Sequence, residues 1–168
     1  MTSNNKVVGV GEFAVSANQG ERIKTFALGS CVAVIFLHKP SRSVGLIHVA
    51  LPDSRISPDI AAKRPGYFAD TGIPAILKEM AVLTGTGTSN GLARGMVVKM
   101  AGGANVMDTN NTFNIGKRNI LALKKILWPL GMGPAAEDVG GGFSRTVTVG
   151  VASGRVFISC AGKGEWEL

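Results

Sequence analysis

Residues 31–51, with the sequence CVAVIFLHKPSRSVGLIHVAL, contain two apolar runs separated by a polar turn. The first run, residues 31–37, is apolar throughout and rich in β-branched side chains, which predicts a strand buried on both faces. The turn contains Pro40, and the chain returns as a second predicted strand over residues 44–51. Together the two runs predict a β-hairpin.

The loop length of this hairpin determines which side chains share a face. If residues 39–42 close the loop, Ala33 faces His48. Side chains alternate along a strand, so Cys31 and His48 would then be diagonal neighbours on one face, about 7–8 Å apart at Cα. A thiol and an imidazole within reach are the minimum for a cysteine nucleophile with a general base. The alternative is that Cys31 is an inert thiol packed in an apolar strand.

The rest of the chain mixes predicted strands with two predicted helices. Further strands are expected over 7–10, 23–28 and 94–100, and a second hairpin over 146–149 and 155–160. Strands and helices do not alternate regularly, which favours an α+β fold, a layered sandwich of mixed or antiparallel sheets with helices packed on the outside. With 168 residues and no linker or repeat, the chain is expected to form one domain, residues 1–168.

Both helices are predicted from apolar side chains at helical spacing. The first follows a loop over 53–65, has Pro74 in its first turn and ends at Gly85; its apolar face is Ile73, Ile76, Leu77, Met80 and Leu83. The second follows Asn114 and ends at a Gly131 cap; its apolar face is Ile120, Leu123, Leu127 and Leu130.

The composition excludes several classes of protein. The net charge is +7, but the basic residues are dispersed and only 6% of residues are aromatic, which argues against a nucleic-acid-binding surface. The longest apolar run, residues 31–37, is far shorter than the roughly 20 residues that span a bilayer. The polar residues 1–6 do not resemble a signal peptide, and two cysteines suit a reducing compartment. We therefore expect a cytoplasmic protein without a membrane-inserted segment.

The remaining histidine and cysteine have simpler interpretations. His38 falls in the turn and is expected to be solvated, and Cys160 is expected to be a packing residue of its strand. The sequence has no Cys, His or carboxylate spacing typical of a metal site, so no metal or cofactor is expected. Backbone N–H groups around Gly29 and Ser30 are candidate oxyanion donors, because glycine permits close approach of a substrate.

Six motifs, in order along the chain, carry a resemblance to a known family. They are LGSCVAV (28–34), GLIHVALP (45–52), KMAGGA (99–104), NIGKRN (114–119), DVGG (138–141) and SGRV (153–156). The sequence resembles the CheD family of chemoreceptor glutamine deamidases over nearly its whole length. That resemblance implies a sandwich fold similar to the catalytic domain of deamidating necrotizing-factor toxins.

The resemblance also implies the roles of three residues. The family's catalytic cysteine matches Cys31, its histidine matches His48 in the His-x-x-Leu-Pro motif, and its threonine matches Thr25. Taken alone, Thr25 could equally be an ordinary strand threonine. The implied substrates are glutamines on the cytoplasmic helices of chemotaxis receptors, and a CheC-type phosphatase is an implied partner. Hydrolysis of receptor methyl esters is a related expectation, and a non-catalytic adaptor that binds receptors or the phosphatase is the alternative function.

Overall fold

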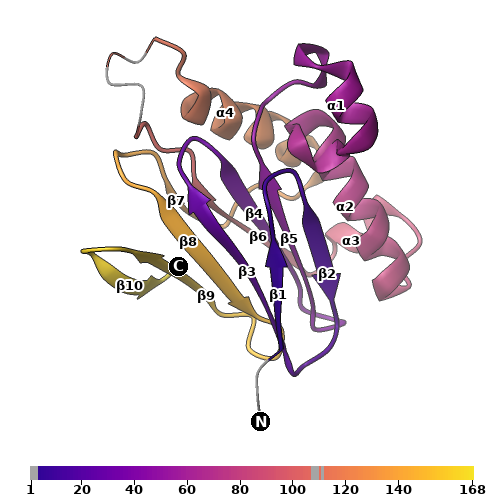
Figure 1. The fold of residues 1–168 in the computed structure, drawn as a ribbon. Coiled ribbons are helices and arrows are strands. Elements are labelled where there is room, and N and C mark those ends of the chain that lie inside the picture. Colours follow the sequence, from indigo (N-terminus) through magenta and orange to yellow (C-terminus); the bar gives the residue numbers. More distant parts are fainter. Residues whose placement is uncertain (1–3, 107–109, 111) are drawn as a thin grey trace.

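A computed structural model describes residues 4–106, 110 and 112–168. In this part of the chain, two five-stranded sheets stack face to face and helices cover the outer face of one of them (Figure 1). The uncovered sheet has the order β1-β3-β8-β9-β10. Its strands are β1 (Asn4–Val8), β3 (Glu21–Leu28), β8 (Arg145–Gly150), β9 (Val156–Cys160) and β10 (Gly164–Glu167).

The helix-covered sheet has the order β2-β5-β4-β6-β7. Its strands are β2 (Phe13–Ser16), β4 (Val32–His38), β5 (Ser43–Val49), β6 (Met96–Gly102) and β7 (Ala136–Val139). The helices are α1 (Pro58–Lys63), α2 (Ala69–Thr84), α3 (Ser89–Ala93) and α4 (Ile115–Leu127), with 3-10 turns η1 (Ser54–Ile56), η2 (Pro65–Tyr67) and η3 (Trp128–Leu130).

The central β4–β5 hairpin confirms the predicted register. His38 pairs with Ser43 and Ala33 pairs with His48, so residues 39–42 form the predicted four-residue loop. All residues of β4 and β5 are buried, because β4 lies between β5 and β6 and both faces of the sheet are covered. The hairpin is therefore the middle of the molecule.

Two apolar cores follow from the alternation of side chains along β4. Val32, Val34 and Phe36 pack with the helices, whereas Ala33 and Ile35 pack with the uncovered sheet. Most pairings are antiparallel, but β1 with β3 and β6 with β7 are parallel. The predicted α+β sandwich of mixed sheets with outer helices is confirmed.

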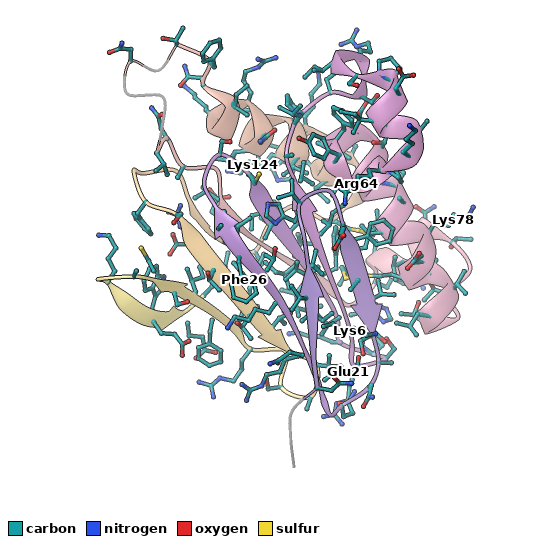
Figure 2. All side chains as sticks on the ribbon, in the orientation of Figure 1. Lys6, Glu21, Phe26, Arg64, Lys78 and Lys124 are labelled. Atoms are coloured by element: carbon teal, nitrogen blue, oxygen red, sulfur yellow. The ribbon has the colours of Figure 1, made fainter. Side chains whose placement is uncertain are left out.

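The two ends of the sandwich differ. Figure 2 shows Lys6 and Glu21 close together at the end where the N-terminus emerges, and their side chains form an ion pair of 3.3 Å. Since Glu21 begins β3 and Leu28 ends it, the connection from β3 to β4 lies at the opposite end.

The first predicted helix starts earlier than expected. α2 begins at Ala69, so Pro74 lies inside the helix and not in its first turn. The additional turn is buried through small residues, Ala69 and Gly72, which an apolar-spacing search does not find. The helix ends at Gly85 as predicted, but Leu83 in its last turn is 40% exposed, so the buried face ends before it.

Other boundaries also differ from the predictions. Residues 53–65, expected as a loop, contain η1 and α1, and Pro58 occupies the first turn of α1. α4 follows Asn114 as predicted, but it stops at Leu127, and Gly131 caps η3 instead. β2, β7 and β10 were not expected; each has only four residues. Across the described ranges, no helix has both the length and the apolar character needed to cross a bilayer.

Candidate active site

Cys31 lies where the chain crosses from one sheet to the other. β3 carries an irregularity between Thr25 and Leu28, with Ala27 at φ 56°, and the Gly29 N–H donates to the Ala27 carbonyl at 3.0 Å. Residues 29–31 then lead directly into β4. The thiol is half-buried and packs against the core between the sheets. Cys31 and His48 thus share a face, as the hairpin register predicted.

The carbonyls of the crossing segment 29–31 all accept hydrogen bonds from the protein. The Ala104 N–H donates to Gly29 O at 2.7 Å, and the Gly103 N–H donates to Cys31 O at 2.8 Å. The Ser30 carbonyl between them accepts from the Asn119 side-chain amide at 3.0 Å. These bonds fix the backbone on both sides of the thiol.

His48 reaches across to the uncovered sheet, where it contacts Thr25. The two atoms Thr25 Oγ1 and His48 Nδ1 are 2.7 Å apart, and the Thr25 hydroxyl also lies 2.7 Å from the Val8 carbonyl. A hydroxyl has one hydrogen, and the Val8 carbonyl can only accept it. Thr25 Oγ1 therefore accepts from a protonated His48 Nδ1, which leaves the lone pair of the neutral ring on Nε2.

Nε2 is the free end of this chain of hydrogen bonds. It is buried and has no hydrogen-bond partner among the described residues, which include Cys31. Catalytic hydrogen bonds are often long in unliganded enzymes and shorten when substrate binds. The His48 ring is thus held from one side with its basic nitrogen available on the other.

Burial keeps both the thiol and the imidazole neutral. It raises the pKa of Cys31 above its usual value, and it lowers the pKa of His48 to about 4. At neutral pH the pair consists of a thiol and an unprotonated imidazole. This arrangement suits a general base that removes the thiol proton during attack, in contrast to a preformed thiolate–imidazolium pair.

A cavity of about 500 Å³ opens beside the crossing segment. It is lined by Gly29 and Ser30, by residues 103–106, by the first residues of α4, and by Gly140 and Gly141. Such a volume accommodates a side chain with its neighbouring backbone. The candidate oxyanion residues Gly29 and Ser30 therefore lie in the wall of a cavity.

His38 is not solvated, which corrects the prediction. It ends β4 between Ser43 of β5 and Met96 of β6, and only 4% of the residue is exposed. Its Nδ1 lies 2.6 Å from Ser41 Oγ, whose hydroxyl donates to Ser43 Oγ. The prediction assigned His38 to the turn, but the residue is the last of the central strand β4 and is buried for that reason.

Cys160 takes no part in the arrangement around Cys31. It ends β9, is half-buried, and its thiol donates to the Ala161 carbonyl at 3.5 Å. Both cysteines are free thiols. In the described ranges, no group of three or more His, Cys, Asp or Glu side chains is placed to hold a metal ion.

Sequence reasoning did not single out Asn119. Its side chain is fully buried, and its Nδ2 donates to both Ser30 O and Ala50 O, at 3.0 and 2.9 Å. The available signal was its spacing, because Asn119 lies four residues before Leu123 and thus on the apolar face of α4. A polar residue at such a position requires hydrogen-bond partners.

Comparisons with known proteins relate this chain to chemotaxis proteins. Residues 50–160 match the family model described as CheD chemotactic sensory transduction. The chain is 52% identical over 162 residues (96% of this chain, 98% of the other) to a probable chemoreceptor glutamine deamidase CheD of Syntrophotalea carbinolica. It is 38% identical to the probable chemoreceptor glutamine deamidase CheD 1 of Syntrophus aciditrophicus, covering 93% and 94% of the two chains. It is 36% identical to the chemoreceptor glutamine deamidase CheD of Thermotoga maritima, covering 95% and 94%.

Proposed function

Because the chain belongs to the CheD family, we propose that it hydrolyses glutamine side chains of chemotaxis receptors to glutamate, with Cys31 as nucleophile, His48 as general base and Thr25 as the residue that orients His48. The observation that supports these roles most directly is the Val8–Thr25–His48 chain of hydrogen bonds. It leaves the in-plane lone pair on Nε2, and the His48 side chain lies on the same side of the sheet as Cys31.

The reaction begins with proton transfer from the Cys31 thiol to His48 Nε2. The sulfur attacks the carboxamide carbon, a C–S bond forms, and the carbonyl oxygen becomes an oxyanion. The proton on Nε2 is then given to the amide nitrogen, the C–N bond breaks, and ammonia leaves. A thioester to Cys31 remains.

Water completes the reaction. His48 Nε2 takes a proton from the water as its oxygen attacks the thioester carbon, and the C–S bond then breaks. The proton returns to the Cys31 sulfur, which restores the thiol and releases glutamate. Throughout these steps the Nδ1–H group keeps donating its hydrogen bond to Thr25 Oγ1, so the ring does not need to turn between accepting and donating protons at Nε2.

The crossing segment is the proposed source of oxyanion stabilisation. Its carbonyls, at Gly29, Ser30 and Cys31, are held by hydrogen bonds from within the protein. In the described part of the chain, the N–H groups of Ser30 and Cys31 have no backbone acceptor. These N–H groups are therefore the proposed donors to the developing oxyanion, whereas the N–H of Gly29, also expected as a donor, already bonds the Ala27 carbonyl.

The substrate and partner assignments are part of the proposal. The three relatives named above are chemoreceptor glutamine deamidases by name, and the net charge of +7 suits an acidic partner surface. The same acyl transfer would also hydrolyse receptor methyl esters, with methanol leaving in place of ammonia. A CheC-type phosphatase is proposed as a second protein partner.

The deciding experiment compares the wild-type protein with Cys31→Ala on a receptor cytoplasmic fragment, followed by intact mass and ammonia release. Cys160→Ala is the matched control, since it removes the other free thiol. We expect deamidation by wild type and Cys160→Ala and none by Cys31→Ala. Binding of the fragment without conversion by any of the three would support the adaptor alternative instead.

A further inference from the structure

We propose that Asn119 is a positioning residue, which holds the backbone before the nucleophile and the backbone after the base at a fixed separation. The inference rests on the proposed function of Cys31 and His48. Ser30 immediately precedes Cys31, and Ala50 follows His48 by two residues. One side-chain amide donates to the carbonyls of both, at 3.0 and 2.9 Å.

The two contacted carbonyls belong to segments that the sheet does not hold together. The β4–β5 ladder ends at the Val32–Val49 pair, so Ser30 and Ala50 both lie beyond its last rung. Asn119 Nδ2 has two hydrogens, and each is used on one segment. The amide thus continues the cross-strand connection at the place where backbone pairing has stopped.

The supporting helix is set close to the same backbone. A Cβ atom at Gly116, one turn before Asn119, would overlap the Gly103 carbonyl oxygen. Gly103 in turn donates its N–H to the Cys31 carbonyl. α4 therefore supports the backbone around Cys31 in two ways, by packing against Gly103 and through the Asn119 side chain, and a shift of the helix would move both.

The chemistry of the side chain fits a donor role specifically. Asn119 is fully buried, and its Oδ1 has no hydrogen-bond partner in the described ranges. An apolar side chain of similar size would fill the same space without burying that oxygen, but it would leave the Ser30 and Ala50 carbonyls without their donor. The geometry thus assigns the NH₂ group, and not the volume, to the role.

The test is Asn119→Leu, which keeps the branching at Cγ and the number of side-chain heavy atoms and removes both donors. It is made in a Cys160→Ala background that leaves Cys31 as the single thiol. We expect kcat for deamidation to fall about ten- to a hundredfold with little change in KM, because misplacement of reacting groups costs rates of that order. We expect the alkylation rate of Cys31 by iodoacetamide at neutral pH to rise, because a loosened crossing segment exposes the thiol.

Leu123→Ala is the matched control, since Leu123 lies one turn further along the same buried face of α4. It removes buried apolar contacts of α4 but keeps both Asn119 hydrogen bonds, which hold the helix against residues 30 and 50, so neither kcat per folded molecule nor Cys31 alkylation should change. If Asn119→Leu behaves like Leu123→Ala in both measurements, Asn119 is only structural and the proposal is wrong.

A second variant covers the case in which Asn119→Leu does not fold. Asn119→Gln keeps an NH₂ donor but displaces it by one methylene, so this variant should fold, lose part of kcat and show a smaller rise in Cys31 alkylation than Asn119→Leu. A wild-type kcat together with a wild-type alkylation rate in Asn119→Gln would overturn the proposal. The alkylation measurement does not need the receptor. If wild type fails to deamidate while Asn119 variants still accelerate alkylation, the proposed function fails and the positioning role stands.

Discussion

Replacing His48 with glutamine should remove a large part of the pH dependence of folding below neutral pH. The His48 side chain is 1% exposed, and burial lowers its pKa to about 4 from an ordinary value of 6.5. In the unfolded chain the imidazole binds a proton near pH 6.5, whereas in the folded protein it stays neutral until about pH 4. Protonation therefore stabilises the unfolded state relative to the folded state over this interval.

The size of the effect follows from the two pKa values. Each pKa unit corresponds to about 1.4 kcal/mol, so the wild-type protein should lose about 3 kcal/mol of unfolding free energy as the pH falls from 6.5 to 4. Above pH 6.5 this contribution is fully present, and below pH 4 it is entirely lost. Glutamine does not titrate, so His48→Gln should lack this component whatever its stability at neutral pH.

Urea unfolding followed by tryptophan fluorescence, at about pH 7, 5.5 and 4.5, measures the effect directly. Carboxylates such as Asp53, whose pKa Arg55 holds at about 2, contribute equally to both proteins and cancel in the comparison. Equal pH slopes for wild type and His48→Gln would show that the buried imidazole titrates normally. In that case burial would not lower the pKa of His48, and the description of a buried imidazole that stays neutral below about pH 6 would be wrong.

Three further predictions concern neighbouring residues. Thr25→Val should lower kcat/KM about 10- to 100-fold, because a buried hydrogen bond of about 1–3 kcal/mol is lost. Thr25→Ser keeps the hydroxyl and should keep most of the rate, and steady-state kinetics on the receptor fragment distinguish the two variants. Cys31→Ala should abolish turnover and leave the thermal unfolding midpoint near that of wild type, since the thiol is small and only half-buried. Calorimetry measures the midpoint, and an unchanged rate would refute the assignment of Cys31 as nucleophile. Gly102→Ala should lower the free energy of unfolding by more than about 2 kcal/mol, because φ at residue 102 is +112° and the new Cβ would overlap the Cys31 carbonyl. Gly154→Ala, also at positive φ but in open space, should lower it by about 1 kcal/mol, and urea unfolding measures the difference.

The central hairpin could be predicted from sequence because its information is local. A continuous apolar run, a polar turn and a second apolar run predict a hairpin. The register given by a four-residue loop, which the structure has, puts Cys31 and His48 on one face. The partner of His48 could not be found in this way. Thr25 lies on the other sheet, so its contact depends on how the two sheets stack, and only the family resemblance indicated it.

The mispredicted elements have the same origin. The first turn of α2 is buried through Ala69 and Gly72, whose fit depends on the neighbouring sheet and not on their own hydrophobicity. His38 looks like a turn residue until β6 is placed against β4. Asn119 looks like a neutral helix position until the ends of the β4–β5 ladder are seen beside it. In each case the deciding contact is distant along the chain.

The crossing of the chain at residues 29–31 has a consequence for biogenesis. Thr25 belongs to one sheet and His48 to the other, and the cysteine lies on the short segment between them. A newly made chain in which only one sheet has formed, or in which the two sheets have not yet docked, lacks the contact by which Thr25 orients the His48 imidazole. Such a chain would carry an ordinary, unassisted thiol. If the proposed roles hold, hydrolytic competence should therefore arise late in folding, together with the final docking of the two sheets.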